Sequence, residues 1–367
     1  MNNIPDIEKI KQTPMFFILG RPRTGSTLLR TLFDAHPGVI IPSEWPMLLL
    51  LNLQFGKVTF WDKNKLEEFY QALFQPLRIP YWSIRNWPGF DAGLLHTNIM
   101  KCEGRHTLET LIKVVYYHYN SFFPKGDILF IGDKNPAISN HPEVLARIFP
   151  EAKFIHLVRD YRDNLVSMLG VDFEMPNVTL LTYRWKHSFR VIEKAAAKYP
   201  GRFLRLRYED LVRRPEKEFG SLCQFLGIPE DPSIFDFHTR AKEMEASLPP
   251  DVSKRYFSSL MQPIDERKVG VYKQGLTSKQ VRIADLVAGR TALKAGYQRD
   301  SVKFAPAEYL WVAPAILYTK GLYVIGKLVS LLPFRWMLWL MNKPSVVVGL
   351  YTMLFKSRSV SAHPKGV

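Results

Sequence analysis

Short apolar runs alternate with stretches of helical periodicity along most of the chain. Runs with the length and composition of buried strands occupy residues 15–19, 39–41, 127–131, 153–158 and 202–206. Apolar residues at helical spacing predict helices over residues 26–35, 107–123, 138–149, 176–198 and 277–297. The last of these opens on Thr277 and Gln280, the pattern of a capping box. This alternation predicts an α/β fold, a three-layer α/β/α arrangement with a mostly parallel central sheet.

Two regions depart from this alternation. Residues 45–100 are rich in Trp, Leu and Pro and show weak periodicity, which fits either a lid over the core or an apolar wall for a substrate. The composition changes again near Asp300. We therefore expect one catalytic domain over residues 1–300 and a helical tail over residues 301–367.

The most informative stretch joins the first predicted strand to the first predicted helix. Its turn, GRPRTGST over residues 20–27, contains two glycines, two arginines and adjacent hydroxyl side chains. Such a turn directs backbone N–H groups and the positive end of the helix dipole at one point, where Ser26 and Thr27 add hydroxyl donors. The stretch therefore predicts a P-loop-like cradle for an anion. A tight turn that only caps the helix is the simpler alternative.

The loop lacks the lysine of nucleotide triphosphatases, because Ser26 occupies that position. Arg21 and Arg23 supply positive charge from within the loop instead. A kinase or GTPase needs the lysine on its β- and γ-phosphates and a carboxylate for Mg²⁺. Arginines and hydroxyls suit a phosphosulfate, whose transferred group carries less charge and needs no metal.

The loop resembles the 5′-phosphosulfate loop of sulfotransferases that use 3′-phosphoadenosine-5′-phosphosulfate (PAPS). Its continuation, LLRTLFDAHPGV followed by Glu44, is especially similar to tyrosylprotein and carbohydrate sulfotransferases. The resemblance implies PAPS as co-substrate, no metal and a hydroxyl-bearing acceptor. It assigns the phosphosulfate of the donor to the loop residues Arg21, Arg23, Thr24, Gly25, Ser26 and Thr27.

The resemblance also assigns the other end of the donor. In the family, an arginine at a strand end and a serine eight residues later bind the 3′-phosphate, and these are Arg159 and Ser167 here. An ion pair of Arg159 with Asp160 or Asp163 is the alternative. Tyr208 occupies a position that often contacts the adenosine in the family, although a core tyrosine fits the same pattern.

A later segment, RKVGVYKQGL over residues 267–276, resembles a family segment that closes over the 3′-phosphate. The alignment assigns Arg267, Lys268 and Gly270 to this contact. Val271 departs from the family, which often has arginine there, and this departure counts against the assignment.

Sulfuryl transfer to an alcohol requires stabilisation of the charge that grows on the bridging oxygen and removal of the acceptor's proton. We assign the first role to Arg23 and Lys134; for Lys134, which follows a predicted strand, a solvated loop lysine is the alternative. We assign the second role to Glu44, because the resembling enzymes place their base glutamate at the same distance from the loop. His36 and His156 are rival bases. His36, however, has the position of a helix terminus, and His156 lies inside a predicted core strand.

Length and composition limit the class of protein. The chain has 367 residues, 47% of them hydrophobic, which allows one large core or one core with a small appendage. Its two cysteines, Cys102 and Cys223, form neither a disulfide framework nor a metal set and are expected to be free thiols. Residues 1–14 contain no apolar segment of a secretory signal, so we expect a cytoplasmic active site.

The tail predicts a membrane partner. The net charge of +16 calls for anionic partners, and the tail contributes +7, from eight Lys and Arg residues against Glu308. Basic residues interleaved with aromatic and aliphatic ones fit helices that lie in a membrane interface, and the uncharged runs are too short for a simple spanning helix. We expect peripheral binding to an anionic inner membrane surface, with Trp311, Trp336 and Trp339 in the apolar part. A cover packed on the domain, or on the second subunit of a homodimer, is the alternative. The apolar density argues against nucleic acid.

Two other functions stay open at this point. One is a metal-dependent nucleotide kinase or NTPase, against which the absent lysine counts. The other is a non-catalytic, membrane-tethered module that binds a nucleotide. The acceptor is open as well, because a lipid or glycolipid hydroxyl fits the tail, whereas a sugar or a peptide tyrosine fits the family resemblance.

Overall fold

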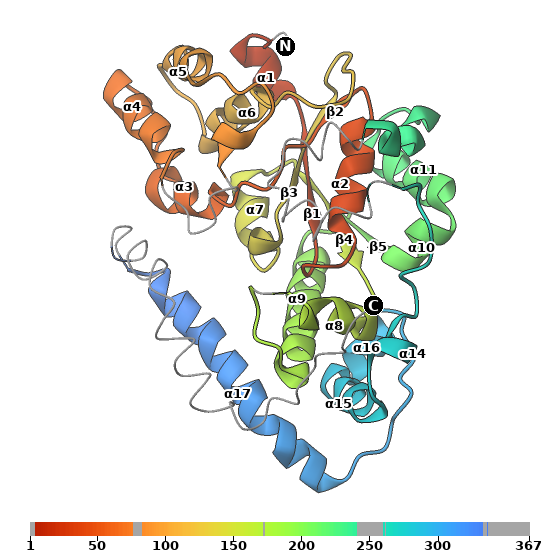
Figure 1. The fold of residues 1–367 in the computed structure, drawn as a ribbon. Coiled ribbons are helices and arrows are strands. Elements are labelled where there is room, and N and C mark those ends of the chain that lie inside the picture. The colour runs from red at the N-terminus through yellow and green to blue at the C-terminus, as the bar shows by residue number, and fades with distance from the viewer. Residues whose placement is uncertain are drawn as a thin grey trace. The chain divides into compact units, whose positions relative to one another are not determined.

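The computed structural model describes residues 4–75, 83–171, 173–240, 260, 262–332 and 336. Five strands form one sheet in the order β2-β3-β1-β4-β5 (Figure 1). The strands are β1 (Met15–Leu19), β2 (Val39–Ile40), β3 (Phe130–Lys134), β4 (Lys153–Val158) and β5 (Phe203–Arg207). β1 pairs in parallel with β3 and β4, and β2 pairs in parallel with β3. The predicted α/β class is therefore confirmed.

Helices and short 3₁₀ turns connect the strands (Figure 1). Before β3 they are α1 (Ile7–Gln12), α2 (Ser26–Ala35), α3 (Leu48–Phe55), α4 (Lys63–Ala72), η2 (Ile84–Asn86), α5 (Ala92–Met100) and α6 (Leu108–Tyr117). Between β3 and β5 they are η3 (Pro136–Ile138), α7 (Pro142–Ile148), α8 (Tyr161–Leu169) and α9 (Val178–Lys198). After β5 they are α10 (Tyr208–Arg213), α11 (Pro215–Leu226), η4 (Pro232–Arg240), α14 (Tyr272–Gly275), α15 (Ser278–Ala288), α16 (Arg290–Lys294) and α17 (Pro306–Val329).

Neighbouring side chains of β1 contact helical layers on the two faces of the sheet. Phe16 packs on Phe33 of α2, with ring centroids 4.6 Å apart. Phe17 packs on Phe149, directly after α7, with ring centroids 5.1 Å apart. Because successive side chains of a strand point to opposite faces, these contacts place one helical layer on each side of the sheet, as predicted.

Some predicted element bounds shift in the structure. β3 extends over residues 130–134 rather than 127–131, so it contains Asp133 and Lys134. The helix predicted over residues 138–149 begins only at Pro142. The helix predicted from residue 277 has its capping box but breaks at Gly289 into α15 and α16.

Contacts divide the chain into two compact units. The described residues of the first unit lie within 1–20, 25–157 and 192–266, and those of the second lie within 21–24, 158–191 and 267–336. In the second unit, Arg282 of α15 pairs with Glu308 of α17 at 2.7 Å. The predicted domain boundary near Asp300 stays a prediction, and the part of the tail from residue 337 onward lies outside the described residues.

The core of the first unit is tightly packed around Gly132 in β3. A Cβ added there would lie 2.6 Å from Cζ of Phe16 and 2.8 Å from Cδ1 of Ile41. β3 therefore packs against its neighbours more closely than a residue with a side chain allows. Cys102 and Cys223 are buried in the same unit as free thiols, as predicted.

Candidate functional site

The predicted site residues lie at or just beyond the carboxyl ends of the strands. Each strand carries one of them: the loop 20–27 after β1, Glu44 after β2, Lys134 at the end of β3, Arg159 after β4 and Tyr208 after β5. Parallel strands have their carboxyl ends at the same edge of the sheet, and ligands of open α/β sheets bind outside that edge.

Two residues of the loop have a left-handed backbone. Gly25, the N-cap of α2, has φ 91°, and Arg23 has φ 66°, which is uncommon for a residue with a side chain. Because the N-cap residue is glycine, no capping side chain satisfies the first N–H groups of α2. The loop thus has the predicted form of an anion cradle at a helix N-terminus.

Tyr208 explains why residue 25 has to be glycine. A Cβ added at Gly25 would lie 2.3 Å from Cδ2 and 2.6 Å from Cε2 of Tyr208. Tyr208 is buried and begins α10, so its ring packs directly on the loop backbone. The structure brings Tyr208 to the loop, and its contact with an adenosine stays a prediction.

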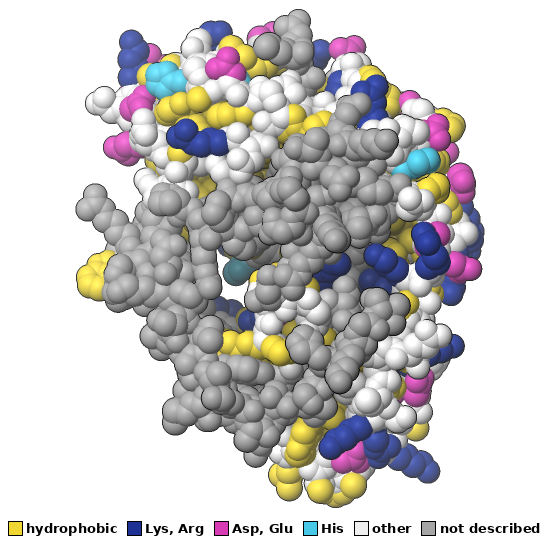
Figure 2. All heavy atoms as spheres, in the orientation of Figure 1, with side chains coloured by type: hydrophobic (Ala, Val, Ile, Leu, Met, Phe, Trp, Pro, Cys, Tyr) yellow, Lys and Arg dark blue, Asp and Glu magenta, His cyan; other side chains and the backbone are white. Residues whose placement is uncertain are grey.

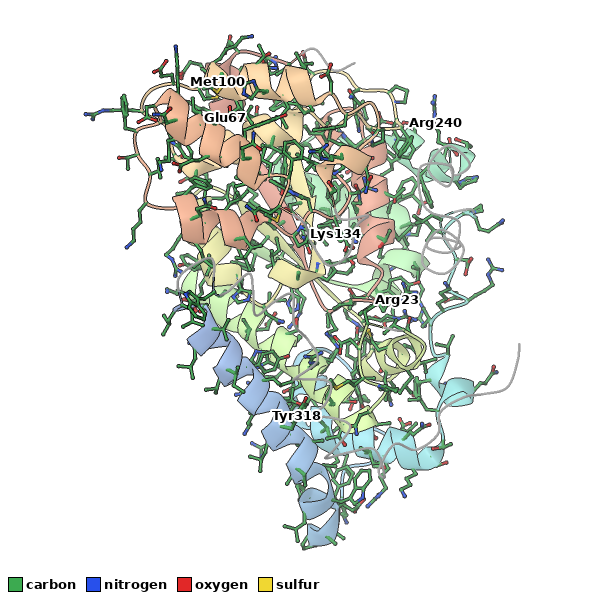
Figure 3. All side chains as sticks on the ribbon, turned by 60° about the vertical axis from the view of Figure 1, so that its left-hand side comes forward. Arg23, Glu67, Met100, Lys134, Arg240 and Tyr318 are labelled. Atoms are coloured by element: carbon green, nitrogen blue, oxygen red, sulfur yellow. The ribbon has the colours of Figure 1, made fainter. Side chains whose placement is uncertain are left out.

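Lys134 lies at the end of β3 (Figure 3) and contacts both the loop helix and Glu44. Its Nζ donates to Oγ1 of Thr27 at 3.3 Å and forms an ion pair with the Glu44 carboxylate. The side chain of Lys134 is 3% exposed and that of Glu44 is 25% exposed. The carboxylate compensates the charge of the buried ammonium, which would be costly to leave unpaired. The solvated loop lysine is therefore excluded, and Lys134 and Glu44, two of the three residues predicted to be catalytic, contact each other.

Asp133 lies beneath this pair, on the opposite face of β3 from Lys134. It accepts a hydrogen bond from the hydroxyl of Tyr116 in α6, and both side chains are buried. Burial raises the pKa of Asp133 to about 7, and the Glu44 carboxylate acts in the same direction, against the Tyr116 hydroxyl and Lys134. Below neutral pH the protonated Asp133 therefore adds no negative charge beneath the pair.

In the second unit, Arg23 is hydrogen-bonded to α8, and Arg159 is hydrogen-bonded to the segment that begins at residue 267. Nε of Arg23 donates to Oγ of Ser167 at 3.0 Å. The Arg159 guanidinium donates to the backbone carbonyls of Arg23 and Lys268. The resemblance assigns Arg159, Ser167 and Lys268 to one phosphate, and the structure brings these residues together. The contact between Arg23 and Ser167, which are assigned to different ends of the donor, is not expected from the sequence.

Asp160 and Asp163, the alternative partners of Arg159, bind backbone groups, and Asp160 also pairs with the Arg162 guanidinium at 2.7 Å. Asp160 caps α8 with its side chain. Asp163 accepts the N–H groups of Gly270 at 2.7 Å and of Tyr272 at 2.9 Å. Burial raises the pKa of Asp163, against these two donors and the nearby charge of Arg159. The two hydrogen bonds hold the later segment on α8, beside Arg159.

The remaining predicted residues are placed as follows. The hydroxyl of Thr24 donates to the carbonyl of Arg21 at 2.9 Å, within the loop. Ser26 is buried in the first turn of α2. Arg267 and Lys268 are exposed, so their side chains are accessible to a ligand.

The two rival bases are buried and hydrogen-bonded within the core. Nδ1 of His36 accepts the N–H of Gly38 at 3.0 Å, and its Nε2 lies 2.9 Å from the carbonyl oxygen of Pro229. Nδ1 of His156 lies 2.9 Å from Oε1 of Glu193. Burial lowers the pKa of both rings. Both histidines thus have structural partners, which favours Glu44 as the base.

No sequence pattern marks Glu174 and Arg184, yet Glu174 contacts the loop residue Arg21 and joins it to Arg184. Nη1 of Arg21 pairs with the Glu174 carboxylate at 2.7 Å, and Nη1 of Arg184 in α9 pairs with it at 2.6 Å. Burial acts to raise the pKa of Glu174, but the two guanidinium groups outweigh it, and the pKa is lowered. A charged pair of this kind could be found only from the tertiary structure, because Glu174 lies in an irregular stretch between two helices.

Comparisons with known proteins identify the family that the loop sequence resembles. A model described as "Sulfotransferase family" matches residues 14–232. A protein-tyrosine sulfotransferase 1 from Danio rerio is 27% identical over 232 residues, which cover 61% of this chain and 56% of that protein. A protein-tyrosine sulfotransferase from Drosophila melanogaster is 25% identical over 231 residues, which cover 61% of this chain and 40% of that protein. The chain thus spans about half the length of the curated relatives it matches.

A solved structure supports the fold. The sulfotransferase domain from the Synechococcus PCC 7002 olefin synthase has a TM-score of 0.50 and 22% sequence identity. The likeness covers 75% of this chain and 94% of that domain. At this identity the likeness concerns the architecture alone.

Proposed function

This chain belongs to the sulfotransferase family, and we propose that it transfers a sulfuryl group from PAPS to the hydroxyl group of an acceptor. The observation that carries the proposal is the contact of Lys134 with Glu44 and Thr27 at the N-terminus of α2. This cluster supplies a cation for the leaving group, a carboxylate for the acceptor's proton and a hydroxyl donor in one place.

The residues of the loop fit a phosphosulfate. Arg23 and Gly25 have the left-handed backbone of an anion cradle, and α2 has no capping side chain. Nε and Nη2 of Arg21 are buried and have no hydrogen-bond partner in the described part of the chain, as expected of donors that await an anion. The proposal gives the 3′-phosphate of the donor to Arg159, Ser167, Arg267, Lys268 and Gly270.

In the proposed reaction, Glu44 accepts the proton of the acceptor hydroxyl while the hydroxyl oxygen attacks the sulfur. The bond from sulfur to the bridging oxygen breaks, and Lys134 and Arg23 stabilise the negative charge left on the 5′-phosphate. Lys134 and Glu44 contact each other through one carboxylate oxygen, so the second oxygen of Glu44 can accept the proton while the pair is intact. The proposal includes no metal.

The acceptor is proposed to be a hydroxyl-bearing lipid, glycolipid or sugar. The exposed apolar surface of α17 supports a lipid or glycolipid. The names of the curated relatives support a peptide tyrosine as the competing acceptor. Mass spectrometry of products formed from PAPS with the lipid, glycan and peptide fractions of a lysate distinguishes these classes, and sulfation of peptides alone would contradict the first proposal.

The protein is expected to gain thermal stability from 3′-phosphoadenosine-5′-phosphate (PAP) without Mg²⁺, and much less from ATP with Mg²⁺. The reason is that Ser26 occupies the position of the triphosphatase lysine. A ligand at a hundred times its Kd stabilises a protein by about 2.7 kcal/mol, which thermal-shift measurements resolve. A larger shift with ATP and Mg²⁺ would indicate the kinase or NTPase. Binding of PAP without a sulfated product from any fraction would indicate the non-catalytic module.

We further propose that α17 binds an anionic membrane surface, which would place the protein peripherally on the cytoplasmic face. By length and composition α17 could cross a bilayer, although Val312, Ala315 and Thr319 on one side of it are buried. Hydrophobic side chains gather at the surface where α17 begins (Figure 2). Leu310 and Leu317 are 75% and 64% exposed. A helix with one packed side and one apolar exposed side fits an interfacial position better than a spanning one.

Full-length protein is expected to float with anionic liposomes, to bind less as salt rises and to remain partly bound at high salt. Lysines near an anionic surface contribute about 1 kcal/mol each and are screened by salt, whereas apolar contacts are not. The double substitution Leu310→Glu, Leu317→Glu should remove the salt-resistant fraction. Leu53→Glu, at an exposed position of α3, is the matched control and should float like the wild type. Equal flotation of all three proteins at high salt would contradict the proposal.

A further inference from the structure

Arg21, Glu174 and Arg184 form an ion-pair cluster in the second unit, in which the side chains of Arg21 and Glu174 are largely buried and the Arg184 side chain is 27% exposed. The Glu174 carboxylate accepts from Nη1 of Arg21 at 2.7 Å and from Nη1 of Arg184 at 2.6 Å. The side chains of Arg21 and Glu174 are 9% and 8% exposed. Because two guanidinium cations share one carboxylate, the cluster has an excess of positive charge in a setting with little water.

Arg21 has a complete donor edge that no described residue uses. Its Nη1 binds Glu174, and its Nε and Nη2 are buried without a hydrogen-bond partner in the described part of the chain. Nε of Arg184 is in the same condition among these residues. Nε and Nη2 lie side by side on the guanidinium group and match two oxygens of a carboxylate, sulfate or phosphate. Buried donors are costly to leave unsatisfied, so the cluster is complementary to an anion.

We propose that Arg21 and Arg184 form a binding site for a tetrahedral oxyanion of the sulfate or phosphate type, with Glu174 as the positioning residue that holds both guanidinium groups. The inference rests on the proposed function and adds two residues and a ligand class to it. The oxyanion has two sources, the transferred sulfuryl group of the donor or an anionic group on the acceptor. Since Arg21 belongs to the loop, either source connects the site to the reaction.

Helix α17 contributes to the surroundings of this site. His187, one turn after Arg184 in α9, stacks on Tyr323 of α17 with ring centroids 3.7 Å apart and planes at 12°. Burial raises the pKa of Tyr323, and the Glu174 carboxylate acts in the same direction, against the nearby guanidinium groups. Tyr318, which lies on the same helix (Figure 3), is also near Arg184. Because the donor edge of Arg21 is buried, an anion binds there only if neighbouring atoms move.

The test compares the full-length wild-type protein with Arg184→Gln and with Arg190→Gln. Arg190 is exposed on the same helix, so its substitution removes an equal charge outside the cluster. Isothermal titration without Mg²⁺ measures the binding of PAPS, of PAP, and of inorganic sulfate to the PAP-saturated protein. Arg184 and Arg190 lie outside the loop, so neither variant removes a residue assigned to the 5′-phosphate.

If the site takes the transferred sulfuryl group, Arg184→Gln binds PAPS about tenfold or more weakly than the wild type and binds PAP equally well. If it takes an anion of the acceptor, affinities for PAPS and PAP stay the same, and sulfate no longer binds the PAP-saturated variant. Arg190→Gln shows neither change. The inference is overturned if the two variants behave alike with all three ligands. A wild-type protein that binds neither PAP nor PAPS would instead refute the proposed function.

Two further variants separate positioning from stability. Glu174→Gln should weaken the same anion that Arg184→Gln loses, and Glu174→Asp, which keeps the charge, should restore part of the affinity. A purely structural Glu174 would lower the melting temperature of both variants and leave anion affinity unchanged while the protein is folded. If Arg184→Gln does not fold, Arg184→Lys serves in its place with Arg190→Lys as control, because lysine keeps the charge but lacks the two-pronged edge.

Discussion

Glu44→Ala and Lys134→Ala are each expected to lower turnover by about 10²-fold or more while the affinity for PAP survives. Glu44 is the proposed base, and Lys134 is the proposed cation for the charge that grows on the bridging oxygen in the transition state. Neither residue is assigned to the adenosine or to the 3′-phosphate of the donor, which PAP retains. The measurement is the rate of PAP release from PAPS with the acceptor fraction that product analysis finds active. Lys57→Ala and Glu103→Ala, at exposed positions of the first unit, are the matched controls and should keep the wild-type rate.

The ion pair complicates these substitutions in a way that can be measured. Removal of one partner leaves the other charge buried and unpaired, which lowers stability. Glu44→Gln, which keeps the shape of the side chain, and melting curves for each variant separate this loss from the loss of chemistry. Because the two residues act in one step, the double variant should lose less than the product of the single losses. A Glu44→Gln enzyme at the wild-type rate, together with an inactive but folded His36→Ala or His156→Ala, would show that the base is a histidine.

Gly25→Ala is expected to weaken PAP binding by about tenfold or more and to destabilise the fold. The left-handed backbone costs a residue with a Cβ about 1–2 kcal/mol. The added Cβ would also lie 2.3 Å from the Tyr208 ring, so the loop or the ring has to move. Titration with PAP and urea unfolding measure the two effects.

Gly201→Ala is the matched control for this substitution. Gly201 has φ 78°, close to that of Gly25, but a Cβ added there meets nothing within 4 Å. It should therefore show the backbone cost alone and bind PAP normally. Adding Tyr208→Ala to Gly25→Ala should relieve the steric part only. Normal PAP affinity of Gly25→Ala would mean that the loop is not the phosphosulfate site.

Composition alone predicts some strands correctly. β1 and β4 have the predicted bounds because their residues form continuous apolar runs that only a buried strand accommodates. For β3 the pattern predicts an end at residue 131, because Asp133 and Lys134 resemble loop residues. Their polar groups are satisfied by Tyr116 and Glu44 from distant parts of the chain. Such partners are a property of the fold, which no local pattern reveals.

In the candidate site, too, the local sequence identifies some residues, whereas others are identified only by their partners in the folded chain. The sequence and the resemblance name Glu44 and Lys134, but only the structure shows that they form one ion pair. Arg21 is evident from the loop, whereas Glu174 has no periodicity, motif or spacing that singles it out. Its importance arises from burial between two arginines, and burial of a single irregular residue depends on packing that local sequence does not encode.

The position of the Lys134 ammonium relative to the loop helix depends on Gly132, two residues earlier in β3, which has no side chain. Gly132 and Lys134 share one face of β3. Any larger residue at position 132 would meet Phe16 and Ile41 and push the strand outward, and Lys134 would move with it, away from Thr27. The position of the proposed catalytic cation therefore depends on how β3 packs as well as on its charge partner. An enzyme engineer who wished to retune the reach of this lysine would edit the volume at residue 132 and leave residue 134 unchanged.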